Sequence, residues 1–154
     1  MDDIENTASY ARRTAAGNFD LHDVAISFNA DFLDEDTCRC WILDTIYHVK
    51  DFSCPRCSAP LTEKGLRRFR MAERVRCHAC GKFFTALTGT FLQGCHLTFR
   101  QIILLAVFLY FGIRHEAIAD KVGVSEETVR LWQKKFQAIK QIRAIEDENG
   151  SAEI

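Results

Sequence analysis

Two pairs of cysteines have the spacing of a metal site. The sequence contains Cys54-Pro-Arg-Cys57 and Cys77-His-Ala-Cys80, with nineteen residues between the pairs. Two CxxC turns at this separation are typical of a site in which four thiolates hold one zinc ion. Zinc prefers a tetrahedral ligand set, and four cysteines leave no position open for water or substrate. The spacing therefore predicts one structural Zn²⁺ rather than a catalytic metal.

The remaining cysteines indicate no catalytic site. Cys38 and Cys40 offer a second pair of thiols, but residues two apart on a helix point to different sides, so we interpret Cys38 as a small buried residue. Cys95 lies beside His96, yet adjacent residues rarely aim at each other, and no oxyanion site or orienting carboxylate is recognisable. We therefore expect no enzymatic activity.

Basic residues gather between the two cysteine pairs. Thirteen residues contain Lys64, Arg67, Arg68, Arg70, Arg74 and Arg76. The stretches 69–71 and 74–76 resemble short alternating strands, so Arg70, Arg74 and Arg76 are expected to share one face. We expect the five arginines to contact DNA phosphates. The alternative is that they support folding or pair with the acidic N-terminus.

A second pattern, from His115 to Lys134, matches the helix-turn-helix template. Apolar residues occupy the positions at which two steeply crossing helices pack, namely Ile118, Val122, Val124, Val129 and Trp132. Gly123 stands where the turn needs a left-handed residue, and Ser125 can cap the helix that follows. The alternative is an ordinary helical hairpin with a glycine turn.

Polar side chains of this pattern are candidates for DNA contact. If Val129, Trp132 and Phe136 are buried, the rest of the second helix is available to a ligand. We expect Thr128, Arg130 and Gln133 to reach base edges, because Arg pairs well with guanine and Gln with adenine. We expect Lys134, Lys135 and Arg114 to contact phosphates.

The elements that position these residues predict an α+β, mostly helical fold. An N-terminal helix over 35–48 begins at Asp34, and a small four-cysteine zinc ribbon over 52–87 follows, with Gly65 in a turn. Phe83, Phe84 and Leu87 are expected to pack beneath the metal. A C-terminal three-helix unit then comprises residues 99–111, capped by Thr98, 114–121 and 126–145. The apolar sequence of its first helix indicates burial on all sides.

Charge is strongly segregated along the chain. The net charge is −1, but residues 1–36 carry −7, residues 37–145 carry +10 and residues 146–154 carry −4. A basic middle between acidic ends is typical of a protein that binds a polyanion. We accordingly divide the chain into an acidic arm (1–26), a helix plus zinc ribbon (27–92), a helix-turn-helix unit (93–145) and an acidic tail (146–154). The arm either competes with DNA for the basic middle or simply aids solubility.

The location in the cell is expected to be the cytoplasm, in association with the nucleoid. The acidic N-terminus does not resemble a signal peptide, and the longest apolar stretch, 102–111, is about half of a membrane span. Seven cysteines in a reducing compartment favour metal binding and free thiols over disulfides.

The order of these motifs resembles the N-terminal region of insertion-sequence transposases of the IS1595 group. The matching residues are Phe32, Asp34, Glu35 and Cys38; Phe52 to Cys57; Arg76 to Gly81; Phe84, Thr88 to Phe91 and Leu97; and Thr128 to Trp132. Members of that family continue into an RNase H-like nuclease domain with three carboxylates, whereas this chain ends at Ile154. The resemblance therefore implies the DNA-recognition half without the cleavage chemistry.

Together these patterns predict a zinc-stabilised protein that binds double-stranded DNA. We expect a transcription regulator or accessory factor derived from a transposase. The alternative is an interaction module whose ribbon docks on a polymerase or a nuclease subunit. A homodimer is a further alternative, although no heptad pattern marks a dimer face.

Overall fold

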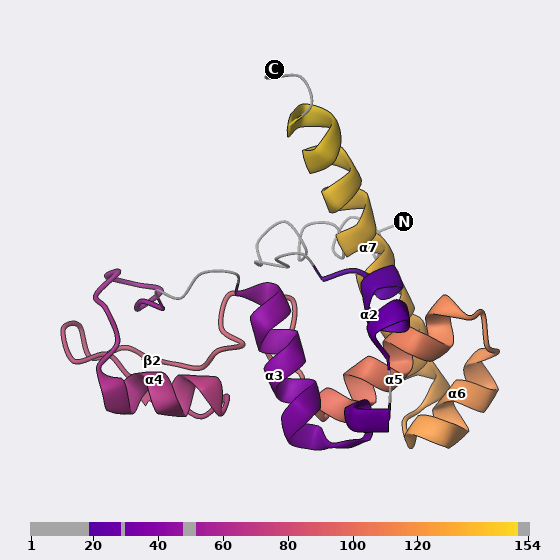
Figure 1. The fold of residues 1–154 in the computed structure, drawn as a ribbon, viewed down its shortest axis with the longest axis horizontal. Coiled ribbons are helices and arrows are strands. Elements are labelled where there is room, and N and C mark those ends of the chain that lie inside the picture. Colours follow the sequence, from indigo (N-terminus) through magenta and orange to yellow (C-terminus); the bar gives the residue numbers. More distant parts are fainter. Residues whose placement is uncertain (1–18, 29, 48–51, 151–154) are drawn as a thin grey trace.

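The fold consists of a helical body and a small ribbon. The structure is a computed structural model that describes residues 19–28, 30–47 and 52–150 of the chain. The helical body contains α2 (Leu21–Ser27), the 3-10 helix η1 (Ala30–Leu33), α3 (Glu35–Ile46), α5 (Phe99–Tyr110), α6 (His115–Val122) and α7 (Glu126–Gly150). The ribbon, residues 52–87, contains α4 (Glu63–Arg70) and the hairpin of β1 (Val75–Arg76) and β2 (Phe83–Phe84). In Figure 1 the ribbon and α6 lie at opposite ends of the long axis. The described part of the chain is thus mostly helical, as predicted.

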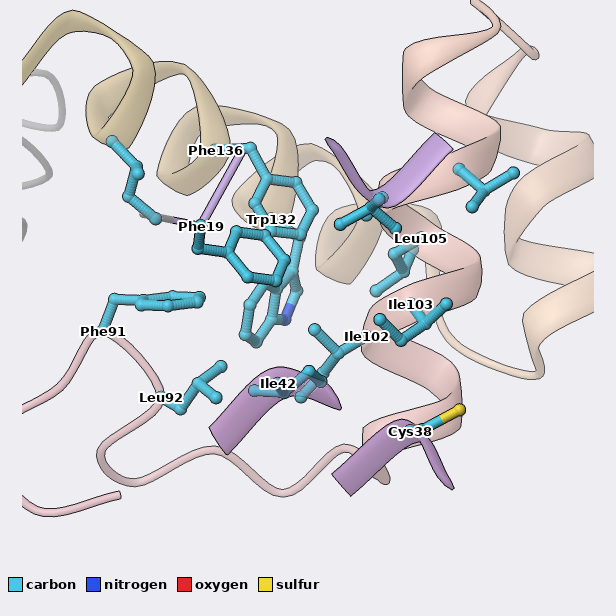
Figure 2. Close-up of a cluster of buried hydrophobic side chains, with 14 of the residues drawn as sticks. Phe19, Cys38, Ile42, Phe91, Leu92, Ile102, Ile103, Leu105, Trp132 and Phe136 are labelled. Atoms are coloured by element: carbon cyan, nitrogen blue, oxygen red, sulfur yellow. The ribbon is translucent and has the colours of Figure 1, made fainter. Parts of the chain in front are cut away.

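Helix α5 is the centre of the helical body. Its buried residues are Ile102, Ile103, Leu105, Ala106 and Val107, and α2, α3, α6 and α7 all contact it. Aromatic rings from distant segments close the core beside it, with Phe91 near Trp132 and Trp132 near Phe136 (Figure 2). The predicted burial of α5 on most of its circumference is confirmed. None of the described helices combines the length and apolar character needed to cross a membrane.

Residues 19–27 belong to this core, so the prediction of an acidic arm up to residue 26 is wrong for that stretch. The Phe19 side chain is 1% exposed, and its ring centroid lies 5.2 Å from that of Phe91 and 5.8 Å from that of Phe136. Val24, one turn into α2, is also fully buried. Two apolar side chains outweigh the local acidity because their burial removes large apolar surfaces from water. Residues 1–18 lie outside the described residues.

Most helix boundaries follow the predicted caps. The Thr98 side chain accepts from the Gln101 N–H, and the Gln101 side chain accepts from the Thr98 N–H, which completes a capping box. Asp34 accepts from the Thr37 N–H at 2.9 Å at the start of α3. Helix α7 runs to Gly150, five residues beyond the predicted end, so the first residues of the predicted acidic tail are helical. No helix-breaking residue precedes Gly150, which accounts for the continuation.

The ribbon differs from its prediction in one element. Residues 69–71 are not a strand, because α4 covers Glu63–Arg70 and Gly65 lies inside this helix. The Thr62 hydroxyl accepts from the Gly65 N–H at 3.1 Å, and Phe69 is buried. An N-cap and one buried aromatic residue therefore outweigh the alternation that suggested a strand. As a result Arg70 does not share a strand face with Arg74 and Arg76.

Glu35 ties two helices that are far apart in sequence. Its carboxylate accepts from the backbone N–H of Phe99 at 2.8 Å and of Arg100 at 2.9 Å, so a residue of α3 caps the N-terminus of α5. We expect Glu35→Ala to lower the free energy of unfolding by about 1.5–3 kcal/mol, since hydrogen bonds to a charged group are lost. Urea unfolding followed by tryptophan fluorescence measures the change. Glu127→Ala, in the exposed first turn of α7, is the control and should cost less than about 0.5 kcal/mol.

Candidate metal centre and basic surfaces

The four predicted cysteine ligands come together in the ribbon. All four Sγ atoms lie within 4.8 Å of one another, and this is the cluster of potential metal ligands found among the described residues. The Sγ atoms of Cys54 and Cys80 are 3.7 Å apart, and those of Cys57 and Cys77 are 3.5 Å apart. A tetrahedral zinc ion with Zn–S bonds of about 2.3 Å needs sulfurs about 3.8 Å apart, whereas a disulfide needs about 2.05 Å. The donor set therefore fits one tetrahedral metal ion such as Zn²⁺.

Backbone amides prepare these sulfurs for a cation. The Arg56 N–H points to Cys54 Sγ at 3.4 Å, and the Cys80 N–H points to Cys77 Sγ at 3.5 Å. The hydrogen bond from the Cys80 N–H lowers the pKa of the Cys77 thiol to about 6. Although the Ala59 N–H acts in the opposite direction, burial and the Cys77 sulfur raise the pKa of Cys57 to about 12. The Cys57 sulfur thus holds its proton more tightly than the Cys77 sulfur, and a bound cation would displace that proton.

The second knuckle, Cys77 to Cys80, is followed by a turn at Gly81. Gly81 adopts a φ of +75°, which a residue without a Cβ enters at low cost. Its N–H donates to the Cys77 carbonyl at 3.0 Å, and the Cys77 N–H donates to the Lys82 carbonyl at 2.8 Å. These bonds fold the chain around the Cys77 sulfur and lead directly from β1 through the knuckle into β2.

A small apolar cluster supports the centre and connects it to the helical body. Leu43, Phe69, Val75, Phe84 and Ala86 are buried together with Cys54 and Cys77. Tyr47 packs against both this cluster and the body core, and its hydroxyl donates to the Ala86 carbonyl. Arg39 of α3 also donates from Nε to the Arg70 carbonyl at 3.2 Å. Phe84 is buried in this cluster and Leu87 packs against it, which confirms that part of the expected packing beneath the metal.

Phe83 does not pack beneath the metal, which corrects that expectation. Arg76 pairs with Phe83 and Val75 pairs with Phe84 in the antiparallel hairpin. Adjacent strand residues point to opposite faces, so Phe84 can be buried only if Phe83 faces outward. Phe83 is 50% exposed. Strict period-two alternation applied to the sequence would have found this outward aromatic residue.

The ribbon arginines fall into two groups. Arg67, Arg68 and Arg70 lie in the last turn of α4, where positive side chains interact favourably with the helix dipole, and Arg68 pairs with Glu73 at 3.3 Å. Arg74 and Arg76 lie on the hairpin, with their guanidinium carbons 4.1 and 5.7 Å from the Phe83 ring centroid. All five are exposed, but they belong to two elements rather than to one strand face.

The candidate residues of α7 do not all share one face. At about 100° per residue, Thr128 lies about 200° around the helix from Arg130. Arg130 and Lys134 are exposed, whereas Thr128 and Lys135 lie at the opposite edge and are half-buried. Thr128 donates from its N–H to the Ser125 Oγ at 3.1 Å. Burial lowers the pKa of Lys135, and its Nζ lies 4.6 Å from the Trp132 ring centroid. The geometry therefore singles out Arg130 and Lys134 as a pair.

Gln133 and Arg114 line one shallow groove beside that pair. The groove lies between the start of α6 and the first turns of α7 and has a volume of about 390 Å³. Arg114 is the N-cap residue of α6, and no side chain caps this helix end. Glu116 and Glu126 also line the groove, and Glu126 pairs with Arg130 at 2.9 Å. Arg114, Arg130, Gln133 and Lys134 thus form one polar surface, which we call the α7 surface.

The described acidic residues of the N-terminal region do not cover either basic surface. The Asp20 carboxylate lies 3.3 Å from Arg143 Nη1 and caps α2 by accepting from the His22 N–H, while Asp23 lies 4.0 Å from the same Arg143 nitrogen. Arg143 is in the C-terminal half of α7, nine residues beyond Lys134. These two acids hold α2 against α7, and Asp34, Glu35 and Asp36 lie farther along the chain, at the start of α3.

The three cysteines outside the metal centre, Cys38, Cys40 and Cys95, indicate no further metal or catalytic site among the described residues. Cys38 is fully buried and its Sγ donates to the Phe32 carbonyl, while Cys40 is exposed, so the two point apart as expected. Burial raises the pKa of Cys38 to about 11 and also raises the pKa of Cys95, which makes both thiols poor nucleophiles. Comparison of the chain with protein-family models, curated proteins and solved structures gives no match.

Proposed function

We propose that this chain is a zinc-stabilised protein that binds double-stranded DNA through a helix-turn-helix made of α6, the turn at Gly123 and α7. The turn residue Gly123 adopts a φ of +79°, and Ile118, Val122, Val129 and Trp132 are buried between the helices. Ser125 caps α7 through the Thr128 N–H. These features support a helix-turn-helix over a plain helical hairpin.

The observation that carries the proposal is the α7 surface. Arg130 and Lys134 project from the N-terminal half of α7, next to the uncapped N-terminus of α6 that bears Arg114. A helix N-terminus with free amides attracts phosphate, and a neighbouring arginine strengthens that attraction. The Arg130–Glu126 ion pair is exposed on both sides, so exchanging Glu126 for a base edge costs little.

The ribbon would contact DNA away from the α7 surface. Its arginines lie at the opposite end of the long axis from α6 (Figure 1). Phosphate contacts there would raise affinity without reading sequence. On this basis we propose a regulator or accessory factor of transposase origin, without enzymatic activity of its own, that works in the cytoplasm at the nucleoid.

Substitutions on the α7 surface test the proposal. Binding sites are first selected from random duplexes, and affinities are then measured by fluorescence anisotropy over a series of salt concentrations. Arg130→Ala should reduce discrimination between selected and unrelated duplexes by about 1–3 kcal/mol. Lys134→Ala should weaken binding to all duplexes alike and lower the salt slope by about one.

Lys140→Ala is the matched control, because Lys140 is exposed on the same helix two turns beyond the α7 surface. Its salt slope and discrimination should equal those of the parent chain. If the zinc-loaded chain binds no duplex at low salt, the proposal is wrong.

Exposed apolar residues on the ribbon favour a second candidate function, docking on a protein partner. Met71 is 49% exposed and Phe83 is 50% exposed. Under this alternative the ribbon would bind a polymerase or a nuclease subunit, and homodimers would be a further arrangement. Copurification of one stoichiometric partner without nucleic acid, abolished by Met71→Ala, would favour it over DNA binding.

A further inference from the structure

We infer that the outer face of the β1–β2 hairpin binds an unpaired nucleotide, with Phe83 stacking on the base and Arg74 and Arg76 contacting the flanking phosphates. This inference rests on the proposed nucleic-acid function and adds a substrate form to it, namely a single-stranded overhang or an opened base pair. It is carried by the placement of three side chains on one small face.

The first observation is an aromatic ring held outward by the fold. Phe83 lies directly opposite Arg76 in the hairpin and is 50% exposed, while Val75 and Phe84 on the inner face are buried at 3% each. The inner pair packs against Phe69 and the cysteine cluster. The ring is therefore fixed at the surface by the register of the strands, and turning it inward would expose Phe84.

The second observation is positive charge that no described carboxylate neutralises. Arg39, Arg68, Arg130 and Arg143 each lie within 4 Å of an Asp or Glu oxygen, but no such pair includes Arg74 or Arg76 among residues 19–28, 30–47 and 52–150. Arg74 lies over the Phe83 ring at 4.1 Å from its centroid, and Arg76 lies near the ring at 5.7 Å. Two unneutralised cations beside a ring call for an anionic partner.

The third observation is that the hairpin is braced by the metal centre. Arg76 immediately precedes the ligand Cys77, and Phe83 follows the ligand Cys80 by three residues. The Cys77 N–H bonds to the Lys82 carbonyl at 2.8 Å across the knuckle. The backbone that carries Phe83 and the two arginines thus has little freedom to lose on binding, which favours a ligand that makes few contacts.

The combination of an exposed ring with flanking guanidinium groups selects the ligand. Guanidinium groups pair with phosphate oxygens, and an aromatic ring stacks on a base of any sequence. In an intact duplex both faces of an internal base are already stacked, so we expect Phe83 to stack on a base where pairing is interrupted or where one strand continues unpaired.

The test uses the full zinc-loaded chain and three labelled probes. These are a blunt duplex, the same duplex with a five-thymidine overhang, and the five-thymidine single strand without a duplex. Fluorescence anisotropy should show that the overhang tightens binding by about 5- to 100-fold, the range expected for stacking of one base. Phe83→Ala should remove this gain while leaving binding to the blunt duplex unchanged. Phe83→Trp should retain the gain.

Phe111→Ala is the matched control, since Phe111 is 65% exposed on the helical body, and it should keep the full gain. A gain that survives in Phe83→Ala, or no gain in the parent chain, overturns the inference even if the blunt duplex is bound and the proposed function stands. Conversely, Phe83-dependent binding of the overhang and single strand without binding of the blunt duplex supports the inference and refutes duplex recognition. Binding of none of the probes refutes both.

Discussion

Removal of the metal ion should unfold the ribbon and leave the helical body folded. The ribbon is held by an apolar cluster of seven buried residues, of which Cys54 and Cys77 are ligands and Leu43 comes from α3. So small a cluster cannot offset the chain entropy of about 36 residues without metal binding, which contributes about 10–16 kcal/mol in comparable zinc sites. The body core is larger and contains no cysteine ligand.

The positions of the tryptophans allow unfolding of the ribbon to be distinguished from unfolding of the helical body. Both tryptophans of the chain, Trp41 and Trp132, pack in or against the body core, and the ribbon contains none. After a chelator is added, the tryptophan emission and its urea transition should be nearly unchanged. Hydrogen exchange should lose protection at the backbone N–H of Cys77 and along α4, within residues 52–87.

Cys77→Ser should reproduce the effect of the chelator because a ligand is lost. Cys95→Ser is the matched control, because it replaces a half-buried thiol outside the metal centre by the same residue. In this variant the ribbon should keep its protection from hydrogen exchange. Retained protection of the hairpin in the chelated chain, or an equal loss in the ribbon and the body, would contradict the independence of the two parts.

Truncation of the Phe19 side chain should be the most destabilising change in the N-terminal region. Phe19 is 1% exposed and lies between the rings of Trp41, Phe91 and Phe136. We expect Phe19→Ala to cost about 3–5 kcal/mol, a large part of the about 5–15 kcal/mol that stabilises a typical domain. Urea unfolding followed by tryptophan fluorescence measures the loss, and His22→Ala, on the exposed side of α2, should cost less than about 0.5 kcal/mol.

This result bears on how the acidic arm must be tested. Deleting residues 1–25 would remove Phe19 and Val24 from the core, so weaker or tighter DNA binding could not be assigned to charge. Deleting residues 2–18 leaves both side chains in place. If that shorter deletion leaves DNA affinity unchanged at low salt, the arm does not compete with DNA, and its acids serve solubility.

Local signals predicted much of the helical body. Helix ends can be predicted from residue types that cap a helix or adopt a positive φ. The structure has such a cap or left-handed turn at Thr98, Gly123 and Ser125. The CxxC spacing likewise predicted the cysteine cluster, because ligand geometry depends on a few adjacent residues. Such features need no knowledge of distant contacts.

Long-range packing accounts for what could not be predicted. Phe19 reads as one apolar residue in a polar stretch, and only the rings of Phe91 and Phe136 from elsewhere in the chain make it a core residue. Glu35 similarly looks like a first-turn acid of its own helix, whereas it also caps α5 across 64 residues. In α4, alternation over three residues suggested a strand, and the Thr62 cap with burial of Phe69 decided for a helix.

The hydrogen bond from Tyr47 to the Ala86 carbonyl closes the neck of the ribbon. The chain leaves the helical body and returns to it at nearly the same place, so the ribbon is an insertion in that body. Lengthening or shortening such an insertion changes its closure entropy only slowly, by about 0.6 kcal/mol for each doubling. The helical body should therefore tolerate an insert of a different length at this position without rearrangement of its helices.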